Sequence, residues 1–151
     1  PARMRILHKI SEYSAPRVDM VTIYISYIRS ILEQSCTIWH SKLTVEDAAN
    51  IERVQKSAMR IILKDDYTTS EEALEQLMLA KLSDRRDKMC LTFAKNCLKN
   101  EHTSDLFPLN PNYVVGSRNK EKYKVIHANT DRLKNSAVPY LQRLLNENCK
   151  Q

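Results

Sequence analysis

Glycine is almost missing from this chain, which has one glycine among 151 residues. Sheet proteins use glycine at turns and bulges, because it adopts positive φ angles without strain, so this scarcity argues against a strand-rich fold. The chain also lacks a glycine-rich phosphate loop, which argues against the common nucleotide-binding motifs. Apolar residues still make up 42% of the chain, enough for a core. The expected fold class is all-α.

Paired cysteines are also missing, since none of Cys36, Cys90, Cys97 and Cys149 forms a CxxC motif. Structural zinc needs a cluster of thiolate and imidazole ligands. Cys97 and His102 could supply half of such a set, and the other half is absent. Cys90 and Cys97 lie seven residues apart, on one apolar stripe of a predicted helix. We therefore expect four reduced thiols, no metal and no cofactor.

No catalytic constellation is apparent. The segment Lys64-Asp65-Asp66-Tyr67 only superficially resembles the Y-x-D-D hairpin of polymerases, whose aspartates hold magnesium. That hairpin needs flanking strands and a third carboxylate, whereas these aspartates end a helical pattern. The four histidines have no acidic or serine partner at a telling spacing. The prediction is that the chain alone is not an enzyme and has no catalytic residue.

A signal peptide and a membrane-spanning run are not visible in the sequence. This pattern predicts an intracellular protein, cytoplasmic or nuclear, without a membrane partner. The chain begins with Pro1 rather than Met, which we interpret as the mark of an excised fragment or a processed product.

Hydrophobic periodicity predicts a series of helices. They cover residues 3–13, 17–39, 44–63, 69–78, 83–98 and 139–145. Capping boxes at Thr44 and Thr69 open two of them, and Ser83 is expected to cap a third. Residues 100–119 read as a surface loop, residues 122–127 as a weak short strand, and residues 129–135 as a helical turn. The segment 17–39 is apolar on most sides, so we expect a central helix with Trp39 buried at its end.

These elements suggest two regions. Residues 1–68 form a helical bundle, and residues 69–151 form a second helical region packed on it, with a loop at about 100–128 and a final helix. One domain overall is the alternative.

Charge is unevenly distributed around the net value of +6. Residues 1–64 carry 10 basic and 6 acidic residues, residues 65–116 carry 6 and 9, and residues 117–151 carry 8 and 3. A basic start and end around an acidic middle suits a face that binds a polyanion. A basic protein without any anionic partner is the plainer interpretation.

Two basic clusters are candidate nucleic-acid contacts. The first is Arg53, Lys56, Arg60 and Lys64, whose spacing places four cations on one face of a helix, where they could follow a phosphate backbone. The second combines cations with aromatic rings that could stack on bases. Its members are Arg118, Lys120, Lys122, Tyr123, Lys124, His127, Arg132 and Lys134. An ordinary solvated helix face and a solvated connector are the respective alternatives. Arg85-Arg86, next to Asp84 and Asp87, instead predicts an internal ion-pair network.

Four short motifs follow one another along the chain. They are Tyr27-Ile28-Arg29-Ser30-Ile31-Leu32-Glu33 with Trp39, Ile51-Glu52-Arg53-Val54-Gln55-Lys56 with Ala58, Leu82 with Arg85-Arg86, and Ser136-Ala137-Val138-Pro139-Tyr140 with Leu144-Leu145-Asn146. In this order they resemble the C-terminal part of reverse transcriptases from non-LTR (LINE-type) retrotransposons. The likeness covers about residues 3–146, although many relatives have an aromatic residue where this chain has Gln34.

The resemblance implies that residues 1–68 are a thumb-like bundle and residues 69–151 a connector, which together grip a template–primer duplex by its backbone, without catalysis of their own. Its partners would be RNA or an RNA–DNA hybrid, and the palm and fingers domains of a parent polymerase. The alternative is a helical protein-interaction module, such as a domesticated retroelement fragment that has lost the ancestral grip.

Overall fold

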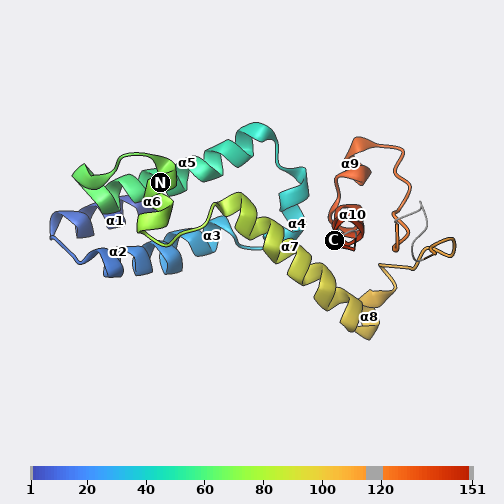
Figure 1. Ribbon diagram of the computed structural model, residues 1–151. Coiled ribbons are helices and arrows are strands. Elements are labelled where there is room, and N and C mark those ends of the chain that lie inside the picture. Colours follow the sequence, from blue (N-terminus) through green and yellow to red (C-terminus); the bar gives the residue numbers. More distant parts are fainter. Residues whose placement is uncertain (1, 115–120, 150–151) are drawn as a thin grey trace. The chain divides into compact units, whose positions relative to one another are not determined.

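The computed structural model describes residues 2–114 and 121–149 (Figure 1). The elements in chain order are α1 (Ala2–Glu12), α2 (Arg17–Ile23), the π-helix η1 (Tyr24–Arg29), α3 (Ser30–Leu32), α4 (Cys36–Trp39), the 3₁₀ turn η2 (His40–Lys42), α5 (Val45–Leu63), the 3₁₀ turn η3 (Lys64–Asp66), α6 (Ser70–Gln76), α7 (Leu82–Lys99), α8 (Glu101–Ser104), α9 (Asp131–Lys134) and α10 (Ala137–Asn148). Within the described ranges there is no strand, only an isolated antiparallel bridge between Leu109 and Tyr123. The all-α prediction is confirmed, and the predicted strand at 122–127 is wrong.

The segment 17–39 is not the continuous helix that its apolar pattern predicts. Hydroxyl groups of Thr22, Ser26 and Ser30 each donate to the carbonyl four residues earlier, at 2.9, 2.7 and 2.6 Å. Such back-bonding competes with the helical ladder and often bends helices, and here it runs along the π-helix. Ser35 then adopts a left-handed conformation with φ 53°, so the chain turns before α4 begins. A single expected helix is therefore divided between two packing environments.

Capping explains where α5 and α6 start. Thr44 Oγ1 accepts the Asp47 backbone N–H at 3.1 Å, while the Asp47 carboxylate accepts from the Thr44 N–H at 3.4 Å. This is the predicted capping box. Thr69 Oγ1 likewise accepts the Glu72 N–H at 3.3 Å, but the Glu72 carboxylate bonds the Thr68 hydroxyl. The second capping box is therefore only half formed.

The chain divides into two compact units. The first comprises residues 1–34 and 44–85, and the second comprises residues 35–43 and 86–151. Residues 69–85 thus pack with the first helices, and residues 35–43 pack with the C-terminal half. The boundaries of these units differ from the expected division into residues 1–68 and 69–151. Residues 35–43 belong to the second unit, and residues 69–85 belong to the first.

The first unit has its own core, made by α1, α2, η1, α5 and α6. Its buried apolar residues are Leu7, Met20, Tyr24, Ile28, Ala58, Met59, Ile62, Leu63, Ala73, Leu77 and Leu79. The helix α5 is 19 residues long, and its buried residues lie in its C-terminal half. Packing of this apolar stripe against the core stabilises the helix.

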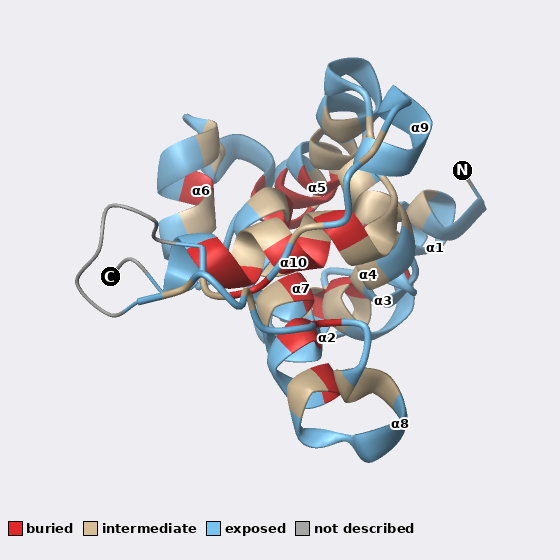
Figure 2. Cartoon of the chain, turned by 90° about the vertical axis from the view of Figure 1, so that its right-hand side faces the viewer, coloured by how far each residue is buried: buried red, intermediate tan, exposed pale blue. Residues whose placement is uncertain are grey.

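The second unit packs α7, α10 and the segment around Phe107 on each other. Its buried residues are Cys90, Ala94, Cys97, Phe107, Tyr123, Leu141 and Leu145. Figure 2 shows buried residues on α10, whereas α9 is exposed throughout. Trp39 is only partly buried, so the expectation of a fully buried core tryptophan is wrong. The break at Ser35 explains this, because Trp39 lies on the short helix α4 rather than at the end of a central helix.

Candidate nucleic-acid interface

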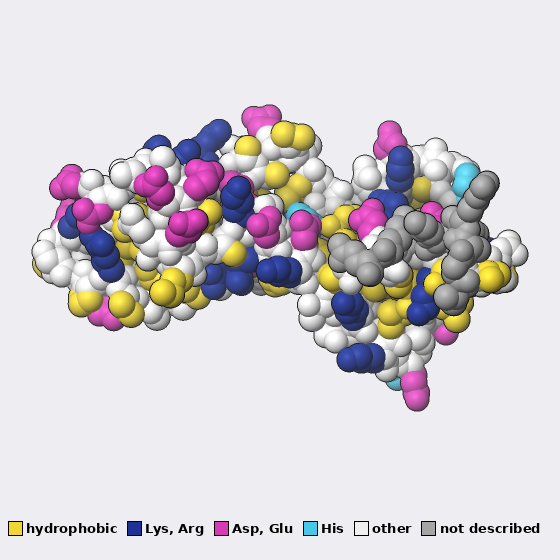
Figure 3. Space-filling view, viewed as in Figure 1, with side chains coloured by type: hydrophobic (Ala, Val, Ile, Leu, Met, Phe, Trp, Pro, Cys, Tyr) yellow, Lys and Arg dark blue, Asp and Glu magenta, His cyan; other side chains and the backbone are white. Residues whose placement is uncertain are grey.

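The first basic cluster lies on the outer face of α5. Arg53, Lys56 and Arg60 are exposed, and they follow one another at i, i+3 and i+7. The opposite face carries Ala58 and Ile62, which are 0% and 3% exposed. Hydrophobic burial thus fixes the rotation of α5 and leaves these three cations in solvent; we call them the α5 basic row. Figure 3 shows Lys and Arg side chains interspersed with Asp and Glu over this part of the molecule.

Intramolecular contacts hold members of the first cluster. Arg53 Nη1 donates to Asn50 Oδ1 at 2.9 Å, and the Arg60 guanidinium lies 5.2 Å from the centroid of the Tyr67 ring. Lys64 differs from the expectation, because α5 ends at Leu63 and Lys64 has a positive φ of 51°. Its Nζ donates to the Ser11 carbonyl at 2.7 Å. Lys64 therefore anchors α1 rather than continuing the row.

A groove of about 480 Å³ runs beside the α5 basic row, within the first unit. It lies between α5, α6 and the start of α7. Arg53, Lys56 and Lys81 supply cations to its lining, and Glu52 and Glu71 supply carboxylates. Because the lining carries both positive and negative charges, the groove does not create a uniformly positive field. It can instead form hydrogen bonds with a polar ligand.

The second cluster is only partly gathered. Arg118 and Lys120 lie outside the described residues. The exposed members are Lys124, His127, Arg132 and Lys134. Lys122 is partly buried, with Nζ 5.7 Å from the centroid of the Tyr123 ring.

Tyr123 requires a correction, because its ring is buried at 9% exposure. The Asn146 side chain explains why: Oδ1 accepts the Tyr123 N–H and Nδ2 donates to the Tyr123 carbonyl, both at 2.8 Å. Asn146 thus pairs with the backbone as a neighbouring strand would. In this conformation the ring packs into the core and is closed to base stacking.

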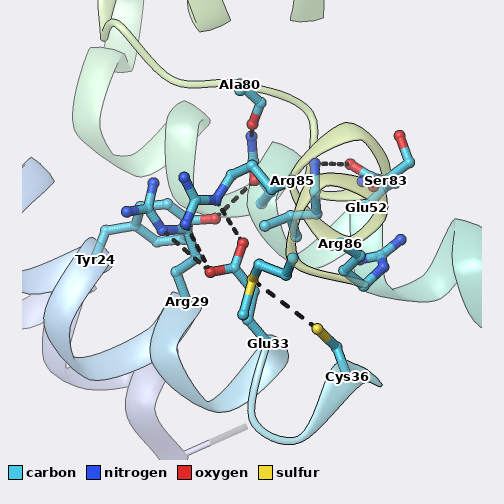
Figure 4. Close-up of polar contacts among 12 residues, drawn as sticks. Tyr24, Arg29, Glu33, Cys36, Glu52, Ala80, Ser83, Arg85 and Arg86 are labelled. Atoms are coloured by element: carbon cyan, nitrogen blue, oxygen red, sulfur yellow. Dashed lines mark hydrogen bonds and ion pairs between the residues drawn. The ribbon is translucent and has the colours of Figure 1, made fainter. Parts of the chain in front are cut away.

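Sequence reasoning missed a buried polar network at the centre of the first unit (Figure 4). The Tyr24 hydroxyl donates to Gln55 Oε1 at 2.9 Å, and Gln55 Nε2 donates to the Ala80 carbonyl at 2.9 Å. Burial raises the pKa of Tyr24 well above its ordinary value. A glutamine inside an apolar helical stripe was the available signal, since a buried amide needs polar partners.

Glu52 serves the same network one helical turn away. Its carboxylate accepts the backbone N–H groups of Leu82 and Ser83 at 3.3 and 2.7 Å. These are unsatisfied donors at the start of α7, so a side chain of α5 caps another helix. The expected cap, Ser83, instead lies inside the first turn of α7.

Arg85 forms an internal ion pair, as predicted, but with a distant partner. Its Nε and Nη2 donate to the two Glu33 carboxylate oxygens at 2.6 and 3.0 Å. This hydrogen-bonded pair raises the pKa of Arg85. Arg29 Nε lies 3.9 Å from the same carboxylate, and burial, followed by repulsion from Arg85, lowers the pKa of Arg29. Glu33 is thus a buried anion between two guanidinium groups.

In the second unit, Arg86 belongs to a chain of polar contacts. Arg86 Nε donates to His40 Nδ1 at 3.3 Å, so the His40 proton is on Nε2, which donates to Asp87 Oδ1 at 2.8 Å. Tyr140 also donates to that oxygen, at 3.3 Å. Burial, and then the charge of Asp87, raises the pKa of Tyr140. The chain of contacts links η2, α7 and α10.

Cysteine burial follows the apolar pattern. Cys36, Cys90 and Cys97 are buried, Cys149 is exposed, and no disulfide joins any of the four. Burial raises the pKa of the Cys90 thiol to about 12, with a smaller contribution from Cys36. Across residues 2–114 and 121–149 no group of three or more His, Cys, Asp or Glu residues is placed to hold a metal ion.

The fold and these sites define the class of the protein as all-α, with an exposed cationic row on α5 and buried polar networks that join its helices. No family model, no curated protein and no solved structure matches this chain. No helix within the described part of the chain is long and apolar enough to cross a membrane.

Proposed function

We propose that the chain is the nucleic-acid-binding thumb and connector part of a non-LTR retrotransposon reverse transcriptase. In this role it grips RNA or an RNA–DNA hybrid by the sugar–phosphate backbone and carries no catalytic residue of its own. The observation that supports the proposal best is the α5 basic row. Three exposed cations lie on the face of α5 opposite its core-facing residues, and a row of this kind can neutralise successive phosphates of one strand.

The contacts of the row suit such a grip. Arg53 and Arg60 are oriented by Asn50 and Tyr67, so fewer side-chain rotamers are lost when phosphate binds. Lys56 lines the adjoining groove together with Lys81. The second cluster, through Lys124, Arg132 and Lys134, adds exposed cations for a backbone contact that is tolerant of base sequence.

The test is binding of a fluorescent RNA–DNA hybrid across a salt series. We expect Arg53→Glu, Lys56→Glu and Arg60→Glu together to weaken binding similarly for all sequences, and each lost phosphate contact to lower the log–log salt slope by roughly 0.7–0.9. A matched control reverses Arg5, Lys9 and Lys95, which are exposed elsewhere. This control changes net charge equally, so an equal loss in both variants would assign binding to overall charge and reject the row.

A helical protein-interaction module is the second candidate, favoured by large apolar side chains in solvent. Tyr13, Val45 and Met78 are 85%, 90% and 95% exposed. Such residues could dock another protein, including the palm and fingers domains that the first proposal requires. Absence of duplex binding by the wild-type chain at moderate salt would favour this second function.

A further inference from the structure

Three sulfur atoms gather in the second unit, and the proposed nucleic-acid function does not use them. Cys36 lies at the start of α4, and Met89 and Cys90 are consecutive in α7. The Cys36 thiol contacts Met89 Sδ at 3.9 Å, a contact drawn from the labelled Cys36 in Figure 4. Cys90, the next residue of α7, interacts electrostatically with Cys36, which adds to burial in raising the pKa of the Cys90 thiol. The left-handed turn at Ser35 starts the helix that brings Cys36 to α7.

This spacing matches the sulfur geometry of a small metal site. With metal–thiolate bonds of about 2.3 Å, two sulfurs of a trigonal site are about 4 Å apart. We propose that Cys36, Met89 and Cys90 form a binding site for one Cu(I) ion, with two thiolates and one thioether as ligands. The ion displaces one proton from each thiol, and no electron is transferred.

The ligand set selects a soft monovalent ion. Thiolate and thioether sulfur prefer Cu(I), whereas structural zinc takes four nitrogen, oxygen or thiolate ligands. Among the described residues no group of three or more His, Cys, Asp or Glu side chains is placed to hold a metal ion, and the His40 imidazole of this unit is already engaged by Arg86 and Asp87. The four ligands that structural zinc takes are therefore not gathered here.

Charge and access also fit Cu(I). Two thiolates and one Cu(I) leave a net charge of −1. The charge of Asp87 disfavours a thiolate at Cys90, whereas the fully buried guanidinium of Arg86 favours it. Arg86 thus offsets part of the charge that the site gains. Cys36 and Cys90 are both 0% exposed, but Met89 is 37% exposed. The thioether is thus the edge through which an ion can enter.

The test is anaerobic titration of the reduced protein with Cu(I) against a chromophoric Cu(I) chelator. We expect one equivalent to be withheld from the chelator by the wild-type chain. Met89→Leu keeps an apolar side chain on α7 and should weaken affinity more than about tenfold, since losing even a group that supports a ligand typically costs that much. Cys36→Ser and Cys90→Ser should abolish the tight equivalent.

Cys97→Ser and Cys149→Ser are the matched controls, since each removes one thiol outside the cluster. They should retain the tight equivalent, and circular dichroism should show that Met89→Leu remains folded. X-ray absorption of the loaded protein should show three sulfur neighbours. Loss of binding in the Cys149 variant, equal affinity of Met89→Leu and wild type, or copper with nitrogen and oxygen neighbours would overturn the site.

Discussion

The Glu52 carboxylate on α5 accepts the Ser83 backbone N–H at 2.7 Å, across 31 residues of sequence. One side chain therefore fixes where α7 begins, because it satisfies donors that the first turn of a helix leaves open. Glu52 belongs to the same motif as Arg53 and Lys56. Neighbouring residues of α5 thus have different roles. Glu52 holds the start of α7, whereas Arg53 and Lys56 are exposed members of the α5 basic row.

Removing this cap should destabilise the first unit. Glu52→Ala leaves the Leu82 and Ser83 N–H groups without the carboxylate, and loss of a helix cap costs about 0.5–2 kcal/mol. Chemical denaturation followed by circular dichroism measures the change. Glu46→Ala, an exposed carboxylate in the first turn of the same helix, is the control. Equal midpoints for both variants would show that Glu52 does not cap α7.

The Tyr24–Gln55 hydrogen bond should matter for stability and for its pH dependence. Tyr24→Phe leaves the buried Gln55 Oε1 without its donor, which costs about 1–3 kcal/mol. Because burial raises the pKa of Tyr24, the folded state holds the phenol proton more tightly than the unfolded state. Its contribution is complete below the ordinary pKa of 10.0 and declines as pH rises above that value.

Denaturation midpoints measured on both sides of pH 10.0 test this sign. The wild type should lose stability with rising pH more steeply than Tyr24→Phe. Tyr13→Phe is the control, because Tyr13 is 85% exposed and should leave the slope unchanged. Parallel slopes for wild type and Tyr24→Phe would contradict the assignment.

The Glu33–Arg85 pair predicts an asymmetric mutational response. Arg85→Met leaves a carboxylate that is 7% exposed without its bidentate partner, and breaking a buried pair in this way costs about 3–5 kcal/mol. The loss should fall toward the lower end, since Arg29 remains near Glu33. Adding Glu33→Gln to Arg85→Met should recover part of the stability. A double-mutant cycle with no coupling would exclude the pair as a structural contact.

Asn146 and Gln142 of α10 should hold the extended segment in the second unit. Gln142 accepts the Ile126 N–H at 2.8 Å and donates to the Leu106 carbonyl at 2.6 Å. Asn146→Ala removes both bonds to the Tyr123 backbone and should cost about 1–3 kcal/mol. Hydrogen exchange at the Tyr123 amide should accelerate, while Asn148→Ala, at an exposed position of the same helix, should leave it protected.

Local signals in the sequence were sufficient for much of the secondary structure. The capping box at Thr44 and the apolar stripe around Ala58 and Ile62 located α5, because capping and burial act within a few residues. The outward orientation of the α5 basic row follows from the same periodicity, since the face opposite a buried stripe is solvated.

The segment 17–39 shows where local reasoning failed. Its apolar residues recur at helical spacing, yet Ser35 turns the chain and places Cys36 and Trp39 in the other compact unit. No glycine marked that turn. A serine in the left-handed region costs conformational energy, and such a conformation persists only when the surrounding structure stabilises it. That stabilisation comes from residues distant in sequence, so the local pattern could not reveal it.

The sequence by itself determined the all-α class, the main helices and which cations on α5 face solvent, because these depend on periodicity and on capping between near neighbours. Tertiary structure decided the partners: Glu33 with Arg85, Glu52 with the start of α7, Asn146 with Tyr123, and Cys36 with Met89. Each pair joins elements that are far apart along the chain. A hydrogen bond, an ion pair or a sulfur contact forms only between groups that lie close in space. For these pairs that proximity arises only after the helices have packed.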